Sequence, residues 1–343
     1  MKNNEHIITD EILTGGTTIP YDDSWKRKVR NFVHGYLVTM RPYLMFISGI
    51  TGIAGISFGE YFNLVRLAGI CMSSFLSYGF GQALTDCSQT DTDAISSPYR
   101  PLARGAISKK SVLITSIIGL CICCSVFILA NPVNALYGVA GLIGLSTYTY
   151  FKRRWWAGPF YNAGIVWLLY MMAINAALPG SSRHESAKIF AGLCIFFGYA
   201  NFVLTGYFKD IAADRATSYL TLPVRYGRRV SAIVSDIFAL LTISGGICAN
   251  ISSRDAHALI STGVPSLIAL VAGISVIVMS QYRLHNNRVD EEAYRAIIPG
   301  LHGYVLVVTS IILANQPSWF VSVLVFVCFY MITLQKRPEK TQI

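Results

Sequence analysis

Long stretches without a charged side chain constrain this chain more than any other feature of its sequence. Residues 111–151 contain no Asp, Glu, Lys, Arg or His, and residues 296–335 contain only His302. A transmembrane helix needs about 20 mostly apolar residues, and each stretch is about twice that length. Each is also divided by a turn signal that contains proline, Pro132 in the first and Pro317 in the second. Both stretches therefore predict a hairpin of two membrane-spanning helices.

Apolar runs of spanning length recur along the whole chain. Only 13% of the 343 residues are charged, whereas roughly 25% are charged in an average soluble domain, so this chain could not cover its own surface in water. The candidate spans are residues 42–59, 63–85, 111–130, 133–151, 156–179, 188–208, 230–250, 257–280, 296–314 and 317–334. We therefore predict an all-α fold, a polytopic membrane helical bundle of nine or ten transmembrane helices. Such a low content of charged residues excludes a soluble globular enzyme, a disordered protein and a nucleic-acid-binding domain. The sequence implies no protein partner.

The basic residues lie in the segments between these runs. If the N-terminus is placed in the cytoplasm and the spans alternate, nearly all of the 28 lysines and arginines fall on the inside, as the positive-inside rule requires. We therefore expect an integral membrane protein, in a bacterial inner membrane, with a cytosolic N-terminus. The expected organisation is a polar cytosolic tail over 1–35, one transmembrane domain over 36–335 and a short cytosolic tail over 336–343. Among the eight cysteines only Cys87 lies in a polar segment, where a reagent should reach it from the cytoplasm.

A first cluster of acidic and amide side chains follows the second run. If that run continues as a helix, Gln82, Asp86, Gln89 and Asp93 are spaced at i, i+4, i+7 and i+11 and share one face, with Asp91 off that stripe. Acidic residues at membrane depth are functional candidates.

A second cluster lies at the end of the sixth run, where Asp210 and Asp214 are four residues apart on one helical face. Either cluster alone could be an ordinary solvated loop. Two clusters on one side, each at the end of a span, favour a cation between them, and Mg²⁺ typically takes one or two carboxylates together with substrate phosphates. The basic residues close to these clusters in sequence are Arg100, Lys152, Arg153, Arg154, Lys209, Arg215 and Arg225.

At these residues the sequence resembles the UbiA superfamily of intramembrane prenyltransferases. The similar segments are DAISSPYRPLARGAIS at 93–108, KDIAADR at 209–215 and TLPVRYG at 221–227. The family's first motif, NDxxDxxxD, fits less closely. Aligned without gaps its middle Asp falls on Gln89, and aligned from the preceding span it falls on Asp86. We favour Asp86 because a carboxylate binds Mg²⁺ better than an amide.

The resemblance implies a prenyltransferase that uses Mg²⁺. It would transfer an isoprenyl group from a prenyl diphosphate to a small electron-rich acceptor, expected to be aromatic, within the membrane lipid. Asp86, Asp93, Asp210 and Asp214 are the implied catalytic residues, and they would bind the metal together with Asp91. The implied diphosphate-binding residues are Arg100, Lys152, Arg153, Lys209, Arg215 and Arg225. The implied pocket residues are Gln82, Gln89, Tyr148, Tyr150, Asn162, Asn201 and Tyr207.

Two other functions stay open. A terpene cyclase of the same superfamily would act on the prenyl diphosphate without an acceptor, and a transporter would also need many spans. Two polar residues inside spans are also open to more than one interpretation. Asp236 fits either a structural pair or the acceptor site, and His302 fits packing better than a role as a general base.

Overall fold

The computed structural model describes residues 22–59, 63–177, 185–253 and 263–337. Every regular element within these ranges is a helix, so the predicted all-α fold is confirmed. Each predicted candidate span is helical over most of its described part. The ends of the two predicted tails, at 1–21 and 338–343, lie outside the described residues.

The first half of the chain forms helices that lead into and out of the first acidic cluster. They are α1 (Asp22–Met40), the 3-10 turn η1 (Pro42–Leu44), α2 (Met45–Ile56), α3 (Leu64–Asp86), α4 (Thr90–Ser96), α5 (Lys109–Ala130) and α6 (Asn134–Lys152).

The second half repeats this pattern of long helices with short ones between them. They are α7 (Gly158–Ala176), α8 (Glu185–Gly206), η2 (Tyr207–Lys209), α9 (Ile211–Ala216), α10 (Leu222–Ser252), α11 (Val264–His285), η3 (Asp290–Glu292), α12 (Tyr294–Asn315), η4 (Pro317–Trp319) and α13 (Phe320–Gln335).

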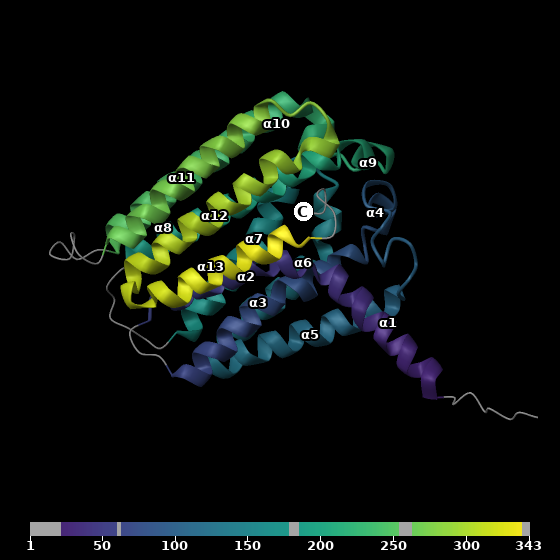
Figure 1. The fold of residues 1–343 in the computed structure, drawn as a ribbon, viewed down its shortest axis with the longest axis horizontal. Helices are drawn as coiled ribbons and strands as arrows, with labels where there is room; N and C mark the ends of the chain where they lie inside the picture. Colours follow the sequence, from purple (N-terminus) through teal and green to yellow (C-terminus); the bar gives the residue numbers. More distant parts are fainter. Residues whose placement is uncertain (1–21, 60–62, 178–184, 254–262, 338–343) are drawn as a thin grey trace, which may run out of the picture.

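The long helices lie side by side as one bundle, and the short helices α4 and α9 lie together at one end of it (Figure 1). The closest helix pairs are α11 with α12, α8 with α10, α3 with α5 and α6 with α7. Helices α2, α8 and α12 contribute most of the main buried cluster. Helices α5, α10 and α11 instead expose many leucine, isoleucine and valine side chains. Such an apolar exterior matches the hydrocarbon of a bilayer.

Within the described residues, eight helical segments are long and apolar enough to cross a membrane. The first of them runs over Trp25–Ile56 and joins α1, η1 and α2. Helices α6 and α7 are not among the eight, and both carry polar side chains that line a cavity, such as Tyr148 and Asn162. The count of nine or ten spans stays a prediction.

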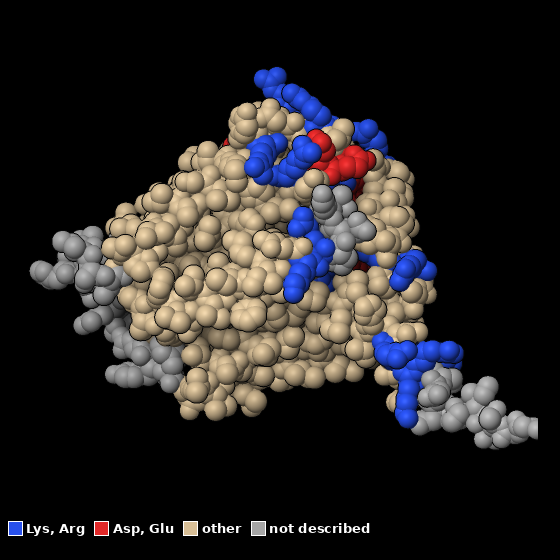
Figure 2. Space-filling model, in the orientation of Figure 1, with Lys and Arg blue, Asp and Glu red and all other residues tan. Residues whose placement is uncertain are grey.

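Charged side chains gather at one end of the bundle. Figure 2 shows Lys, Arg, Asp and Glu around the end that carries α4 and α9, while the long flank seen in this view is uncharged. This is the distribution of a membrane-spanning bundle, because a charge is costly in hydrocarbon. The side of the membrane that this end faces stays a prediction, and Arg183 and Arg254, which the prediction places outside, lie beyond the described residues.

The first acidic cluster does not continue α3, so the predicted single stripe is wrong. Helix α3 ends at Asp86, and the amides of Ser88 and Gln89 bond three residues back, to Thr85 and Asp86, which closes the helix. A new helix, α4, begins at Thr90. Asp86 and Asp93 therefore reach the same region from two helices instead of from one face.

The turn between α3 and α4 also corrects the expectation for Cys87. Its side chain is buried among apolar residues, including Tyr36 and Val112, instead of being open to reagents. Burial raises the pKa of the Cys87 thiol to about 11. Because the thiolate is the reactive form, Cys87 is a poor topology probe.

Candidate active site

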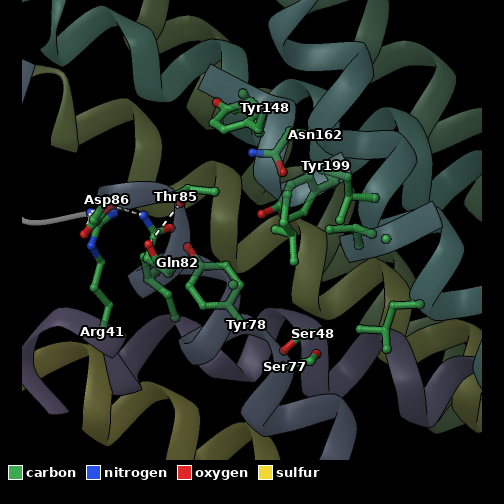
Figure 3. Close-up of a pocket in the computed structure, with 18 of the residues that line it drawn as sticks. Arg41, Ser48, Ser77, Tyr78, Gln82, Thr85, Asp86, Tyr148, Asn162 and Tyr199 are labelled. Carbon is green, nitrogen blue, oxygen red and sulfur yellow. Dashed lines mark hydrogen bonds and ion pairs between the residues drawn. The ribbon is translucent and has the colours of Figure 1, made fainter. Parts of the chain in front are cut away.

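A cavity opens at the charged end of the bundle, between α3, α6, α7 and α8. Figure 3 shows Asp86 and Gln82 on one wall and Tyr148 and Asn162 on another, with Tyr199 near them. Away from the charged end, the cavity is lined by apolar side chains of α5, α6 and α7. They include Leu120, Phe127, Leu145, Ile165, Leu169 and Met172. The cavity therefore joins a charged mouth to an apolar interior.

Four basic side chains line the charged mouth. Arg41, Arg100 and Lys152 are buried, and Lys209 is half-buried. Buried basic groups need negative partners, because an isolated charge is strongly disfavoured away from water. Three of these groups have a carboxylate partner in the structure.

Asp86 is held by Arg41 and Gln82. The Nη2 of Arg41 donates to both carboxylate oxygens, at 3.0 and 2.9 Å, and Gln82 Nε2 donates to Oδ1 at 2.6 Å (Figure 3). Arg41 has a left-handed backbone conformation, with φ of 51°. The next residue is Pro42, and a residue before proline is disfavoured in the right-handed helical region. The chain therefore leaves α1 at Arg41 in a way that aims this side chain at Asp86.

Sequence reasoning missed Arg41 as a site residue and counted it only as a basic residue flanking the first span. The signal that could have found it is an arginine placed directly before a proline at the start of an apolar run.

Asp93 and Arg100 form the second pair of the first cluster. Arg100 Nη1 donates to Asp93 Oδ1 at 2.5 Å, and both side chains are buried. Burial opposes ionisation of Asp93, but Arg100 and then Arg41 outweigh it and hold the pKa of this carboxyl below its usual value. The Nε of Arg100 is buried without a hydrogen-bond partner, so it can donate to a further oxygen.

Lys152 connects the two acidic clusters. Its Nζ donates to Gln89 Oε1 at 2.9 Å and lies 3.7 Å from Asp214 Oδ1. Asp214 is fully buried, and its other oxygen accepts from the Thr221 hydroxyl at 3.2 Å. Burial raises the pKa of Asp214 to about 6, although Lys152 opposes this. The Oδ1 of Asp214 accepts no hydrogen bond.

Asp210 lines the cavity and is half-buried, whereas Asp214 lies behind Lys152 and is not among the lining residues. Asp210 directly precedes α9, and its carbonyl accepts from the Asp214 amide at 2.7 Å. The prediction that Asp210 and Asp214 share one helical face is therefore only partly confirmed. Both carboxylates belong to this charged end, but one faces the cavity and the other supports it.

A set of polar contacts fixes α9 from outside the cavity. Asp290 Oδ2 accepts from the backbone N–H of Ala212 at 2.8 Å, at the first turn of α9. Its other oxygen pairs with Arg228, which also donates to Asn287. Arg228 follows Gly227, whose φ of 79° suits only a residue without a side chain and bends α10 at this point. Asp290 therefore ties the second acidic cluster to the connection between α11 and α12.

Tyrosine rings line the cavity next to the charged mouth. The hydroxyl groups of Tyr148 and Tyr207 are 3.1 Å apart, which links α6 to the end of α8. A Cβ atom at Gly158 would lie 2.2 Å from the Tyr207 hydroxyl oxygen, so only glycine allows Tyr207 this position. Tyr78 and Tyr199 also line the cavity. Ring faces of this kind can stabilise a positive charge.

The comparison with protein families identifies the family to which a chain with this site belongs. The model of the UbiA prenyltransferase family matches residues 45–301, which is most of the chain. The chain belongs to the UbiA prenyltransferase family. The predicted prenyltransferase and the predicted family are thereby confirmed.

Two relatives of this UbiA-family chain share one name. The digeranylgeranylglyceryl phosphate synthase of Pyrococcus abyssi is 26% identical over 218 residues, which cover 62% of this chain and 76% of that protein. The enzyme of the same name from Halobacterium salinarum is 30% identical over 173 residues, covering 49% of this chain and 59% of that one.

Solved structures show the same fold. A digeranylgeranylglyceryl phosphate synthase structure has a TM-score of 0.61 at 18% identity and covers 84% of this chain and 99% of its own. A UbiA homolog from Archaeoglobus fulgidus, bound to DMAPP and Mg²⁺, has a TM-score of 0.60 at 14% identity, covering 79% of this chain and 98% of its own.

Several residues predicted for the UbiA-type site lie outside the cavity. Asp91 is two residues from Asp93 on α4, so it points to the opposite side and pairs with Arg153 at 3.4 Å, where both side chains are largely exposed. Arg215 and Arg225 are exposed and do not line the cavity. The predicted roles of Asp91 in metal binding and of these three arginines in diphosphate binding are not supported by this arrangement.

Helical periodicity also separates the two tyrosines of α6. Tyr150 is two residues beyond Tyr148, so it lies on the opposite side of the helix, largely exposed, with the Arg154 guanidinium 3.8 Å from its ring centre. Tyr150 is therefore not a pocket residue.

Polar residues within the spans divide in the same way. Asn162 lines the cavity, but Asn201 does not, because its side-chain oxygen accepts from Ser235 and joins α8 to α10. Asp236 pairs with His285 at 2.7 Å, and His302 with the Tyr330 hydroxyl at 2.9 Å. Both pairs are structural contacts between helices.

The described residues contain no group of three or more His, Cys, Asp or Glu side chains able to hold a metal ion by themselves. This arrangement still fits Mg²⁺, which keeps waters and substrate phosphates in its coordination sphere and needs only one or two carboxylates. Asp86, Asp93 and Asp210 line the mouth, and Asp214, one of whose oxygens accepts no hydrogen bond, lies behind it.

Proposed function

We propose that this UbiA-family protein transfers an isoprenyl group from an isoprenyl diphosphate to a second molecule within the membrane, with Mg²⁺ as cofactor. The observation that carries the proposal is the two-part cavity, in which a mouth lined by Arg41, Arg100, Lys152 and Lys209 continues into an apolar interior. An isoprenyl diphosphate has the same two parts, an anionic head and an apolar tail.

The balance of charge in the mouth supports a metal-bound diphosphate over a free one. Three acidic and four basic side chains line the mouth, and Asp214 pairs with one of these basic groups, Lys152, from behind it, so the formal charges of the whole group cancel. The lining side chains are Asp86, Asp93 and Asp210, with Arg41, Arg100, Lys152 and Lys209. A diphosphate that carries Mg²⁺ is itself nearly neutral and suits such a site. The Archaeoglobus fulgidus homolog, with DMAPP and Mg²⁺ bound, is consistent with this.

In the proposed reaction the bond between the prenyl carbon and the diphosphate oxygen breaks, and both electrons stay on the diphosphate. Mg²⁺, when bound, would offset the charge that builds up on this leaving group. The unpartnered Nε of Arg100 would donate to a diphosphate oxygen. The rings of Tyr148 and Tyr207 would stabilise the allylic cation, and the apolar walls would keep water from it. The acceptor then forms the new bond to carbon and loses a proton.

For the acceptor we propose a glyceryl phosphate lipid ahead of the aromatic acceptor expected from the sequence. The support is the name shared by the relatives from Pyrococcus and Halobacterium, digeranylgeranylglyceryl phosphate synthase. An acceptor of this kind would enter the cavity from the membrane, as the prenyl tail would.

One assay tests both parts of the proposal. Purified protein is mixed with Mg²⁺ and geranylgeranyl diphosphate, with no acceptor, with a geranylgeranylglyceryl phosphate or with an aromatic acceptor, and diphosphate release is measured. Release only with the glyceryl phosphate supports the full proposal, and release only with the aromatic acceptor replaces the acceptor. Release without any acceptor indicates the cyclase, and no release under any condition contradicts the proposal.

We also propose that the charged end faces the cytoplasm, in accord with the positive-inside rule. The buried Cys87 cannot test this, so an exposed residue at that end is needed, and Glu291 is exposed in η3. Glu291→Cys should be labelled by a membrane-impermeant maleimide only from the cytoplasmic side. Labelling from the outer side alone would reverse the proposed orientation.

A further inference from the structure

Helix α1 carries a stripe of large apolar side chains that the described part of the chain does not cover. Trp25, Val29, Val33 and Leu37 follow one another at intervals of four residues and are 64%, 39%, 49% and 50% exposed. At this spacing they form one face of the helix. A single exposed apolar residue is ordinary, but a continuous stripe of this length marks an interaction surface.

The other end of α1 is firmly packed. Tyr36 and Met40 are buried, and the Tyr36 hydroxyl is 2.8 Å from the Ser116 hydroxyl oxygen of α5. Tyr36 also lies in the second buried cluster with residues of α3 and α5. The N-terminal part of α1 instead leaves the bundle at its charged end and runs obliquely away from the long helices (Figure 1). The uncovered stripe therefore begins on the projecting part.

Basic residues accompany this stripe. Lys26, Arg27, Lys28 and Arg30 are all exposed within the first turns of α1. Figure 2 shows a group of Lys and Arg side chains where α1 leaves the bundle, and two acidic residues, Asp22 and Asp23, precede them at the start of this helix. A helix with an apolar face that includes Trp and with Lys and Arg beside it is typical of segments that lie in the plane of a membrane surface.

Two features indicate that the N-terminal part of α1 does not lie in the hydrocarbon core of the membrane. Four basic residues within five positions are too costly there. The first candidate span, Trp25–Ile56, is also longer than the ~20 residues needed to cross a bilayer, so its basic beginning can stay at the surface.

We propose that α1 is an interfacial anchor. It inserts the stripe of Trp25, Val29, Val33 and Leu37 into the bilayer surface on the active-site side and binds anionic lipid headgroups through its four basic residues. Charge complementarity selects this occupant, because a basic segment next to a membrane is attracted to anionic lipid. A protein surface as the partner would need acidic groups placed to match.

Hydrogen exchange measured by mass spectrometry on the full protein tests the anchor without reference to catalysis. The protein is placed in nanodiscs of phosphatidylcholine and in nanodiscs of phosphatidylcholine and phosphatidylglycerol in equal parts. We expect the amides of 25–37 to exchange about tenfold more slowly with the anionic lipid, and this difference to shrink at high salt. Equal exchange in both lipids at low salt would overturn the proposal.

Matched variants identify the groups responsible. The fourfold variant Lys26→Gln, Arg27→Gln, Lys28→Gln and Arg30→Gln should lose the lipid effect. A control that removes four exposed arginines from the same end, Arg229→Gln, Arg283→Gln, Arg288→Gln and Arg295→Gln, should keep it. Equal loss in both variants would mean a general charge effect and contradict a specific anchor. Protection that rises with protein concentration in detergent and ignores lipid type would instead assign the stripe to a second copy of the chain.

Discussion

The two acidic clusters hold their carboxylates in different ways. In the first cluster, Asp86 and Asp93 each form a close pair with an arginine, Arg41 and Arg100. In the second, Asp214 has a lysine at 3.7 Å and one oxygen without a hydrogen bond. An arginine matches a carboxylate closely through its planar fork, whereas a lysine is a more mobile point charge.

This difference indicates that the two clusters contribute to metal binding in different ways. In the first cluster, both oxygens of Asp86 accept from Arg41, so this carboxylate can bind a cation only if it gives up part of its ion pair, whereas Arg100 bonds only one oxygen of Asp93. The second cluster contains an Asp214 oxygen that accepts no hydrogen bond and has only the 3.7 Å ion pair with Lys152, and the cluster is fixed from outside by Asp290. We therefore expect the second cluster to govern metal affinity directly, and the first to couple metal binding to the position of Arg41 and Arg100.

The largest expected effect is that of Asp86→Asn. It would leave Arg41 buried without its charge partner, which costs about 3–5 kcal/mol when one member of a buried pair is removed. We expect a strongly lowered Tm in detergent and almost no turnover. The double variant Arg41→Gln with Asp86→Asn should recover most of the Tm but not the turnover. Recovery of both would show that Asp86 is structural and that the ungapped alignment, with Gln89, is correct.

A smaller loss of stability but a similar loss of activity is expected for Asp210→Asn. Asp210 lines the cavity and is half-buried, whereas Asp86 is buried in an ion pair with Arg41, so replacement of Asp210 should disturb the fold less. Loss of a carboxylate from a metal–diphosphate site should lower turnover at least about a hundredfold. Asp91→Asn is the control from the first cluster, because Asp91 lies outside the cavity. If the two variants have equal activity, the assignment of Asp210 fails.

Asp290→Asn should have an intermediate effect. The amide keeps an acceptor for Ala212 N but loses the ion pair with Arg228, and a charged hydrogen bond contributes about 1.5–3 kcal/mol. We expect half-maximal activity to need about tenfold more Mg²⁺, measured in a Mg²⁺ titration. Asp236→Asn breaks a comparable pair with His285 and should leave the titration unchanged. A lowered Tm with an unchanged titration would limit Asp290 to a structural role.

The smallest expected effect is that of Gln89→Ala. Lys152 would lose one acceptor but keep Asp214, and a hydrogen bond from a charged group contributes about 1.5 kcal/mol at the lower end, or roughly a tenfold change in rate. Steady-state kinetics should show this modest change. An inactive Gln89→Ala with a normal Asp86→Asn would contradict the difference between these two positions.

The helices could be predicted from the sequence because the bilayer leaves little choice. A segment in hydrocarbon must satisfy all its backbone groups internally, so an apolar run such as 111–130 becomes a helix whatever its side chains. The helix break after Asp86 could not be predicted in this way, because it lies at the membrane surface, where turns are allowed.

The site was predicted where the residue type alone carries the argument, as for Asp210 and Lys152. The prediction was wrong for Tyr150 and Asp91, whose roles depend on the direction in which the side chain points. Each of them lies on the far side of a helix from a residue that lines the cavity. Arg41 was missed because its role depends on Asp86, which is 45 residues further along the chain.

That separation between Arg41 and Asp86 has a consequence for how the protein is made. While the chain is being synthesised, α1 and α2 emerge before α3, so Arg41 exists for a time without its partner. An unpaired arginine stays with water and resists entry into hydrocarbon. At this stage Arg41 limits how deeply the first span can insert into the bilayer. When Asp86 emerges on α3, it pairs with Arg41, and the Arg41 side chain becomes part of the buried wall of the cavity.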